Sequence, residues 1–506
     1  MQIDVIETTS LGDRSYLISA DGVGVVIDPQ RDIDRVLALA AERSTRISLV
    51  LETHLHNDYV SGGLELARTV GADYAVPAGD TVAYDRVPAA EGDVLEAGPM
   101  RFRVMHTPGH THHHVSYVLT EANGQVKAVF TGGSMLYGAT GRTDLVGSEH
   151  TDELTHAQYH SVRRLAAELP AGTPVFPTHG FGSFCSATPT SGDASTVGEQ
   201  TRVNPALTQD EQAFVDQLIA GLDAYPAYYA HMGAINAAGP DPADLSRPRP
   251  VDPAELARRL SVGEWVIDLR TRTAFAAGHL PGALNFELSD SFITYLGWLY
   301  DWGTPLTLIA ETPQQVADAR RQMIRIGIDR INGAAIGRPE DLVHSRPLRS
   351  YPVSDFAGLA AAMKSARKKR EPITVLDARR DDERAGGGVR GSLHIPIHRL
   401  LARIDEVPPG EVWVYCGSGY RASIAASLLA RAGRAPSAPD PEDTAPRELP
   451  HHRPDHPRRA DRPVRRRHRP HPHRRAHPGR VRDRAHPRLD QHPAAPGPGP
   501  RHRPGQ

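Results

Sequence analysis

The sequence predicts an α/β protein built from several domains, and three observations support this. Short apolar runs alternate with helical patterns over residues 1–230. A strand followed by an Asp-x-Arg turn occurs twice, about 110 residues apart. The chain has 506 residues, of which about 430 have the composition of a folded protein, and this length suits two to four domains.

The N-terminal part is expected to form strands that end in loops rich in glycine or histidine. Apolar runs that stop at such loops are typical of buried strands, and amphipathic stretches between them are typical of helices. The expected strands are residues 23–28, 47–51, 101–105 and 126–130, and the expected helices include 33–42 and 62–70.

The repeated pattern indicates a duplicated domain of about 90–100 residues rather than a short solenoid repeat. The first copy contains Asp268-Leu-Arg270 and the second contains Asp377-Ala-Arg379. A stretch rich in proline, alanine and aspartate separates the first copy from the N-terminal part. The expected divisions are an N-terminal domain 1–232, a linker 233–252, a first copy 253–345 and a second copy 352–434.

Residues 435–506 have an unusual composition. They contain 17 arginines against eight acidic residues and no aromatic residue, whereas the whole chain has a net charge of −2. Such a segment buries too little apolar surface to offset its chain entropy, so we expect disorder. No strand pattern follows Arg434, and we hypothesise a frameshift there that leaves the second copy incomplete. A basic tail for nucleic acid is the weaker reading, because aromatic residues are absent.

Several classes of protein are excluded at this point. No run of about 18 apolar residues is present, so no membrane span is expected. Residues 1–5 lack the basic and apolar regions of a secretory signal. The only cysteines, Cys185 and Cys416, rule out a disulfide scaffold and suit a reducing, cytoplasmic compartment.

Histidine-rich loops predict a metal site in the N-terminal domain. His54-Leu-His56-Asn-Asp58 follows one strand, His110 closes a Pro-Gly-His turn after another, and His179 lies in Thr-His-Gly after a third. Neutral imidazoles bind zinc or Fe(II) well, and a carboxylate two residues away reaches the same ion or its water. Because each of these loops follows a strand, we favour a shared metal site over a chance occurrence of histidines.

These loops resemble the metallo-β-lactamase superfamily, a four-layer αβ/βα sandwich with metal at the sheet edges. The similarity is greatest to its persulfide dioxygenase and hydroxyacylglutathione hydrolase branch, and it covers about residues 1–230. The strings that carry it are Thr53-His54-Leu55-His56-Asn57-Asp58, His106-Thr107-Pro108-Gly109-His110-Thr111 and Gly141-Arg142-Thr143-Asp144-Leu145.

The chain departs from this family pattern at two positions. Tyr59 replaces the histidine that usually ends the first motif, and Gly133 replaces a metal-binding aspartate. The resemblance then implies one metal ion, with Fe(II) favoured over the alternative Zn(II). The expected ligands are His54, His56 and His110, and a second site or supporting partners would come from Asp58, His179 and Tyr59, whose hydroxyl could hydrogen-bond a bound ligand.

The second repeat carries a candidate sulfur site. The strand 411–415 ends at Cys416-Gly417-Ser418-Gly419-Tyr420-Arg421, and a helical pattern follows. Backbone N–H groups that converge at a helix N-terminus stabilise a thiolate or a persulfide anion, and Arg421 adds positive charge. This loop favours a reactive cysteine at Cys416.

The two copies resemble rhodanese (sulfurtransferase) domains. The loop Cys-x-x-Gly-x-Arg and Asp377-Ala-Arg379 carry the resemblance in the second copy. The first copy has Glu311 in the region of the cysteine, so it is expected to serve a structural or docking role. Cys185 lacks such a loop and is expected to be a packed or pocket-lining thiol.

Together, the resemblances imply an enzyme of sulfur metabolism. The expected activity is metal-dependent oxidation of a low-molecular-weight thiol persulfide, coupled to sulfur transfer to an acceptor such as sulfite. The residues expected to act in catalysis are Cys416, Arg421 and Asp58. Two alternatives stay open: a zinc-dependent thioester hydrolase, and a non-catalytic sulfur-binding protein with decayed sites. The sequence leaves homo-oligomerisation open.

Overall fold

The computed structural model describes residues 1–439 except 189, 191 and 345. Residues 440–506 lie outside the described residues, so the expected disorder and the frameshift remain predictions. The described residues fall within one compact unit, Met1–Arg447. None of the helices in this described part is long and apolar enough to cross a membrane.

The N-terminal part contains two six-stranded sheets. In the first sheet β1 to β3 form an antiparallel meander, and β4 to β6 continue it in parallel. Its strands, in spatial order, are β1 (Gln2–Thr8), β2 (Asp13–Ala20), β3 (Val23–Ile27), β4 (Arg46–Leu51), β5 (Asp73–Pro77) and β6 (Val87–Ala89).

The second sheet is antiparallel apart from one pair. Only β10 and β11 run parallel in it, which brings the loops after both strands to the same edge. Its strands, in spatial order, are β12 (Ser195–Thr196), β11 (Pro174–Pro177), β10 (Val126–Gly132), β9 (Val115–Thr120), β8 (Met100–His106) and β7 (Val94–Ala97).

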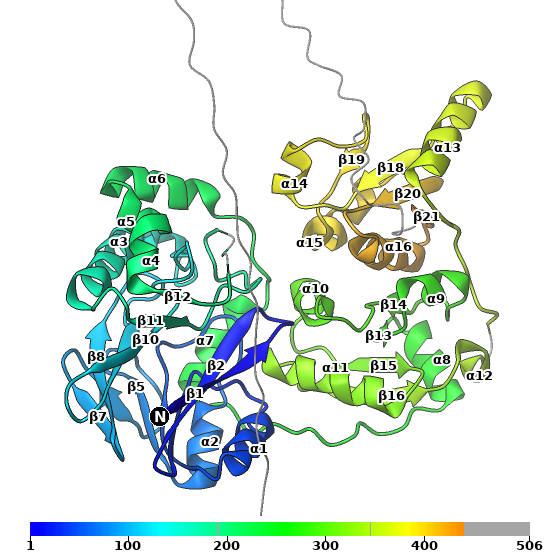
Figure 1. Ribbon diagram of the computed structural model, residues 1–506. Coiled ribbons are helices and arrows are strands. Elements are labelled where there is room, and N and C mark those ends of the chain that lie inside the picture. The colour runs from blue at the N-terminus through cyan, green and yellow to red at the C-terminus, as the bar shows by residue number, and fades with distance from the viewer. Residues whose placement is uncertain (189, 191, 345, 440–506) are drawn as a thin grey trace, which may run out of the picture. The chain divides into compact units, whose positions relative to one another are not determined.

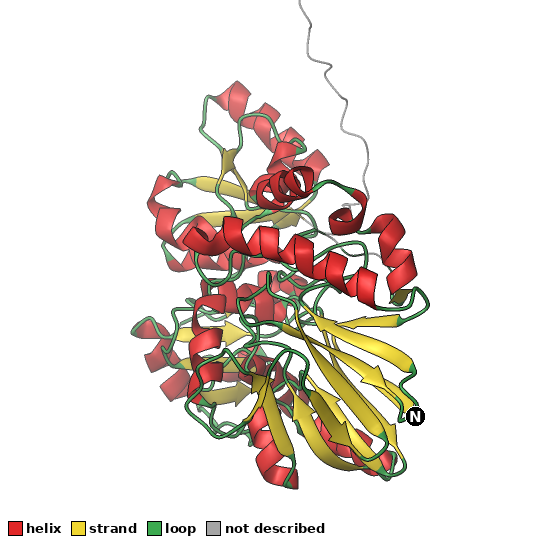
Figure 2. Ribbon diagram, turned by 90° about the vertical axis from the view of Figure 1, so that its left-hand side faces the viewer, coloured by secondary structure: helices red, strands yellow, loops and turns green. Residues whose placement is uncertain are grey.

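The two sheets pack face to face with helices outside them, as Figures 1 and 2 show. A core that includes Tyr16 and Phe130 joins the inner faces, and separate apolar clusters seat helices on each outer face. This arrangement confirms the predicted αβ/βα sandwich. The first sheet carries α1 (Asp34–Glu42) and α2 (Gly63–Val70), and the second is covered by α3 (Thr151–Glu168), α4 (Val197–Val203), α5 (Pro205–Thr208) and α6 (Glu211–Gly221).

The first repeat has a parallel four-stranded sheet in the order β14-β13-β15-β16. Its strands are β13 (Trp265–Asp268), β14 (Leu284–Asn285), β15 (Leu306–Ala310) and β16 (Ile331–Ile336). Its helices are α8 (Pro253–Ser261), α9 (Arg272–Ala277), α10 (Phe292–Leu299), α11 (Pro313–Arg325) and α12 (Pro339–Leu342).

The second repeat has a five-stranded parallel sheet in the order β17-β21-β20-β18-β19. Its strands are β17 (Val353–Ser354), β18 (Thr374–Asp377), β19 (Leu393–His394), β20 (Glu411–Tyr415) and β21 (Ala435–Pro439). Its helices are α13 (Phe356–Lys369), α14 (Asp381–Ala385), α15 (Ile397–Leu400) and α16 (Tyr420–Arg431).

Two expected boundaries differ from the structure. The sequence predicts no strand after Arg434, but β21 follows and pairs with β20 and β17. Strand pairing uses backbone groups, so a run of alanine, proline and serine joins the sheet without an apolar pattern. The expected linker 233–252 is also too long at its start, because α7 (Tyr229–Ala238) continues to Ala238.

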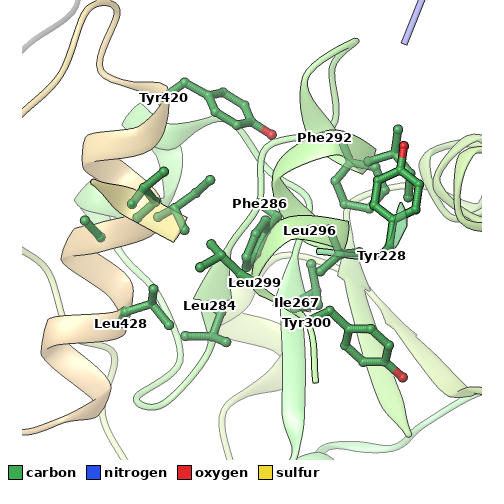
Figure 3. Packing of buried hydrophobic residues seen from close by; sticks show 14 of the residues in the cluster. Tyr228, Ile267, Leu284, Phe286, Phe292, Leu296, Leu299, Tyr300, Tyr420 and Leu428 are labelled. Carbon is green, nitrogen blue, oxygen red and sulfur yellow. The ribbon is translucent and has the colours of Figure 1, made fainter. Parts of the chain in front are cut away.

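One apolar core connects the N-terminal part with both repeats. It includes Tyr59 and Tyr228 from the N-terminal part, Phe292 from the first repeat and Leu428 from the second. Figure 3 shows Tyr228 beside Phe292, with Leu428 on the helix opposite. The backbone of Gly297 lies so close to Tyr228 that an added Cβ would stand 2.4 Å from the tyrosine ring.

Candidate metal centre and sulfur site

Three histidines from loops at the edges of the two sheets come together. His54 follows β4, His110 follows β8 and His179 follows β11, and all three are buried. Each offers a ring nitrogen within 4.8 Å of the other two. His54 and His110 are among the ligands that the sequence predicts, whereas the sequence predicts a second-site or supporting role for His179.

Hydrogen bonds fix the tautomer of the first two rings. The Thr53 hydroxyl donates to Asp28 Oδ2 at 2.8 Å, so it can only accept from Nδ1–H of His54, which lies 2.9 Å away. The backbone carbonyl of Arg142 accepts from Nδ1–H of His110 at 2.7 Å. Nε2 therefore carries the lone pair in both rings.

The third ring is held by two carboxylates. Nδ1–H of His179 faces Asp13 Oδ1 at 2.9 Å and Asp58 Oδ2 at 3.1 Å. Its Nε2 lies 3.3 Å from Nε2 of His54. Asp13, the first residue of β2, was missed by the sequence reasoning, because no local motif marks a partner that lies 166 positions away.

The residues present fit a divalent metal ion. The Nε2 atom of His110 is buried and has no hydrogen-bond partner among the described residues, which is costly unless something else binds its lone pair. Three convergent Nε2 atoms, each oriented through Nδ1 by an oxygen, are the arrangement that metal-binding histidines adopt. Nitrogen ligands of this kind suit zinc, iron and copper alike.

His56 lies beside this group and belongs to a different set of contacts. Its Nε2 lies 3.2 Å from Glu52 Oε2 and 3.0 Å from the Tyr59 hydroxyl, and its Nδ1 has no hydrogen-bond partner in the part of the chain that the structure describes. It shares one candidate metal group with Asp58 and His179, and another with Glu52 and Asp28. The expected set of His54, His56 and His110 therefore stays a prediction, since the structure groups the first and last of these with His179.

The two departures from the family pattern have structural consequences. The Tyr59 hydroxyl contacts His56 and lies 3.2 Å from the backbone oxygen of Asp28, so its hydrogen bonds are made with groups of the protein itself. The Gly133 N–H donates to His114 Nε2 at 3.0 Å. A Cβ at Gly133 would stand 2.2 Å from the His110 ring, so this imidazole fills the space in which a longer side chain would begin.

The second repeat presents its cysteine between β20 and α16, as expected. Cys416 is nearly buried, and Gly419 takes a positive φ of 80° that lets the loop turn into the helix. Arg421, in the first turn, pairs with Glu383, whose Oε1 lies 2.8 Å from Nη2. The N-terminus of α16 and this arginine supply positive potential beside the sulfur.

The first repeat lacks a comparable loop. Its strand β15 ends at Ala310, and Thr312 and Gln315 form a capping box at the start of α11. Helix α11, which corresponds to α16 in the second repeat, therefore begins without a cysteine in the loop before it.

Comparison with known proteins agrees with this geometry. Residues 12–179 match the family model of the metallo-beta-lactamase superfamily, and residues 252–328 and 359–437 match the rhodanese-like domain. A hydroxyacylglutathione hydrolase from Cereibacter sphaeroides is 32% identical over 187 residues, which cover 35% of this chain and 67% of the relative.

The chain belongs to the metallo-β-lactamase superfamily. It also carries two rhodanese-like domains. Hydroxyacylglutathione hydrolase GloC from Haemophilus influenzae is 25% identical over 229 residues, 41% of this chain and 98% of that protein. The crystal structure of a metallo-beta-lactamase from Staphylococcus aureus has 27% identity and a TM-score of 0.60, and the match covers 66% of this chain and 99% of that chain. The chain thus joins a glutathione-related metalloenzyme fold to sulfurtransferase-type domains.

Burial and neighbouring charges set the protonation of the metallo-β-lactamase site. Burial lowers the pKa of His110 to about 3. Burial also acts to lower the pKa of His179, but Asp58 and Asp13 outweigh it and raise that pKa to about 10. Without metal, His179 therefore holds its second proton at Nε2, facing His54. A metal ion bound at this Nε2 would have to displace the proton, so we expect metal affinity to fall as the pH falls.

A cavity of about 700 Å³ is lined by residues next to the candidate metal centre, among them Gly180, which follows His179 in the chain. Its wall includes Ser183 and Phe184 from the metallo-β-lactamase domain and Arg380 and Asp382 from the second rhodanese-like domain. The Ser183 hydroxyl donates to Asp58 Oδ2 at 3.4 Å, which connects the wall to the candidate metal group.

Cys185 lies behind this wall and is fully buried. Burial and the nearby Asp58 carboxylate raise the pKa of its thiol well above the ordinary value. A protonated, buried thiol is a poor nucleophile, in line with the expectation of a packed cysteine.

Proposed function

We propose that this protein oxidises low-molecular-weight thiol persulfides at a single metal ion and transfers sulfane sulfur through Cys416. The observation that carries the proposal is the convergence of three Nε2 atoms, from His54, His110 and His179, in a chain that also presents a cysteine loop of rhodanese type. Three neutral ligands leave the charge of a divalent ion uncompensated, which favours an anionic sulfur substrate.

A single ion is favoured over a pair. His179 belongs to two of the three candidate groups among the described residues, so ions in those two groups would compete for one imidazole. Gly133 offers no carboxylate to bridge them. Fe(II) would supply the activation of O₂, and Zn(II), the alternative, would supply a Lewis acid for hydrolysis.

The chain's own residues have distinct tasks in this scheme. The three imidazoles are oriented by the side chains of Asp13 and Thr53 and by the backbone carbonyl of Arg142. Asp58 accepts a hydrogen bond from Ser183 at the cavity wall, and its Oδ1, which has no partner among the described residues, can accept a hydrogen bond from a bound substrate or water. The overall change is RSSH + O₂ + H₂O → RSH + SO₃²⁻ + 2 H⁺, in which sulfane sulfur is oxidised and O₂ is reduced.

The second half of the proposal concerns Cys416. Its thiolate attacks the terminal sulfur of a donor persulfide, forms a persulfide on the protein and releases the donor thiol. Sulfite then takes that sulfur, which gives thiosulfate and restores the thiolate. Arg421 and the N-terminus of α16 stabilise the negative sulfur during both steps. We place these reactions in the cytoplasm, where thiols stay reduced.

A zinc-dependent thioester hydrolase is the second candidate. It is supported by the named relatives, which are hydroxyacylglutathione hydrolases. A non-catalytic sulfur-binding protein is the third candidate, and this interpretation requires that the protein retains no metal.

Metal analysis and oxygen uptake test the proposal together. About one iron per chain and O₂ consumption with glutathione persulfide are expected, and both are lost in His110→Ala. His113→Ala, an exposed histidine of the same loop, is the matched control and keeps both. Cys416→Ser keeps O₂ uptake and loses thiosulfate formation. Zinc with thioester hydrolysis would support the second candidate instead, and O₂ uptake unaffected by His110→Ala would end the metal-site proposal.

A further inference from the structure

The first rhodanese-like domain lacks a cysteine, yet its helix α11 contacts the loop that carries His56 and Asp58. The backbone N–H of Val60, two residues after Asp58, donates to the carbonyl oxygen of Arg325 at 2.7 Å. Arg325 is the last residue of α11. The carbonyl groups of a helix end have no partner within the helix, so the loop satisfies one of them.

A buried ion pair holds this helix end in place. Arg325 Nε and Nη2 donate to Asp32 Oδ1 and Oδ2 at 3.0 Å and 2.6 Å. The Asp32 side chain is fully buried, and that of Arg325 is 9% exposed. Such a bidentate pair fixes orientation as well as distance.

A second arginine approaches the same helix end from the metallo-β-lactamase domain. Arg31 Nη1 donates to the carbonyl oxygen of Ile324 at 3.1 Å and to Asp329 Oδ1 at 2.8 Å. A positive charge at a helix C-terminus is favourable because that end of the helix dipole is negative. The contact is therefore complementary in charge as well as in shape.

The opposite side of the loop is held by a single amide. The Asn236 side chain on α7 donates to the backbone oxygens of His56 and Tyr59, both at 2.9 Å, and accepts from Ser61 N–H at 2.9 Å. The loop is thus fixed by Asn236 within its own domain and by α11 from the next one. Close packing adds to this, since a Cβ on Gly327 would lie 3.3 Å from Val60 Cγ2.

We propose that the cysteine-less rhodanese-like domain positions the metal-site loop, with Arg325 as the positioning residue that seats α11 against Val60. In the second rhodanese-like domain the helix after the loop serves a sulfur site, whereas here the corresponding helix serves the neighbouring metal site. This inference rests on the proposed function only in treating the loop as part of a metal centre.

The test compares substitutions on one helix in the full-length protein. Arg325→Met keeps the apolar stem and removes the ion pair, while Arg35 at 2.7 Å still pairs with Asp32, so the carboxylate is not left alone. Arg320→Ala is the matched control, because Arg320 lies on the same helix but pairs with Asp244, away from the loop. Arg325→Lys keeps the charge without the bidentate geometry.

Two readouts separate positioning from general stability. In the metal-free protein, hydrogen exchange at the amides of residues 54–62 is expected to rise about tenfold in Arg325→Met, less in Arg325→Lys and not in Arg320→Ala. The Kd for Co(II), measured from the Co(II) absorption spectrum, is expected to rise about tenfold in Arg325→Met, less in Arg325→Lys and not in Arg320→Ala. Sulfur transfer by Cys416 stays unchanged in all three variants.

Unchanged exchange and unchanged Co(II) affinity in both Arg325 variants would overturn the inference, as would equal effects of Arg320→Ala. If Arg325→Met does not fold, Arg325→Lys decides by the same comparison. If the wild type binds no metal, the proposed function fails, and hydrogen exchange in the metal-free protein still decides the role of α11.

Discussion

Nδ1 of His179 lies 2.9 Å from Oδ1 of Asp13, and both side chains are fully buried. This contact joins the start of β2 in one sheet to the loop after β11 in the other. It orients the third imidazole of the candidate metal centre, as the outer partners of metal-binding histidines do.

Asp13→Asn is therefore expected to weaken metal binding about 10- to 100-fold, because the amide is a poorer acceptor for the imidazole N–H. Competition with a chromogenic chelator measures the change. Asp21→Asn, in the exposed turn between β2 and β3, serves as the control and should bind metal like the wild type. Equal affinity in both variants would show that Asp13 has no part in the site.

Gly133→Asp is expected to lower metal content rather than to restore the usual carboxylate. The added Cβ would stand 2.2 Å from His110, so the imidazole must move. Strain of this kind in a close-packed site costs about 1–3 kcal/mol. Metal analysis and thermal unfolding check this, with Gly172→Asp as a control, since nothing lies within 4 Å of a Cβ there. Higher iron content in Gly133→Asp would contradict the packing argument.

Asp32 is expected to make the fold sensitive to acid. Burial acts to raise its pKa, but Arg325 and Arg35 outweigh this and hold the pKa below the ordinary value of 3.8. A carboxyl with a lowered folded-state pKa stabilises the fold above its unfolded pKa, and that stability is lost as the pH falls through the folded value.

Asp32→Asn should accordingly lower the free energy of unfolding by about 3 kcal/mol at pH 7. When the pH falls below about 4, the variant should lose less stability than the wild type does. Urea unfolding from pH 7 to pH 3 measures both effects. Asp34→Asn, at a half-exposed carboxylate that pairs with Arg321, should have a much smaller effect. Parallel loss of stability in the wild type and Asp32→Asn would remove Asp32 from the explanation.

Arg421→Lys is expected to reduce sulfur transfer about tenfold without unfolding the second rhodanese-like domain. Lysine retains the charge but cannot pair with Glu383 through two nitrogens, so the positive group is no longer held beside Cys416. Thiosulfate formation is the measurement, and Arg431→Lys at the other end of α16 is the control. A rate equal to that of the control would assign Arg421 a structural role only.

The sequence predicts what depends on neighbours in the chain. The strand patterns before His54 and Cys416 are local, and β4 and β20 lie where they were expected. The grouping of the candidate ligands is not local, because Nε2 of His56 lies beside Glu52 and Tyr59 while His54 and His110 lie with His179. The orientation of the His179 ring depends on Asp13, which belongs to none of the motifs. Such choices follow from competition between buried side chains, which spacing alone does not encode.

The shared apolar core has a consequence for dividing this protein into fragments. Tyr59 and Tyr228 on one side pack in the same core as Phe292 and Leu296 on the other. A polypeptide that ends before the first rhodanese-like domain would present these aromatic faces to water, next to the loop that carries Asp58. It would be prone to self-association, and an assay on it would report on an altered loop rather than on the intact protein. The smallest unit that can be studied on its own therefore reaches well beyond the histidines.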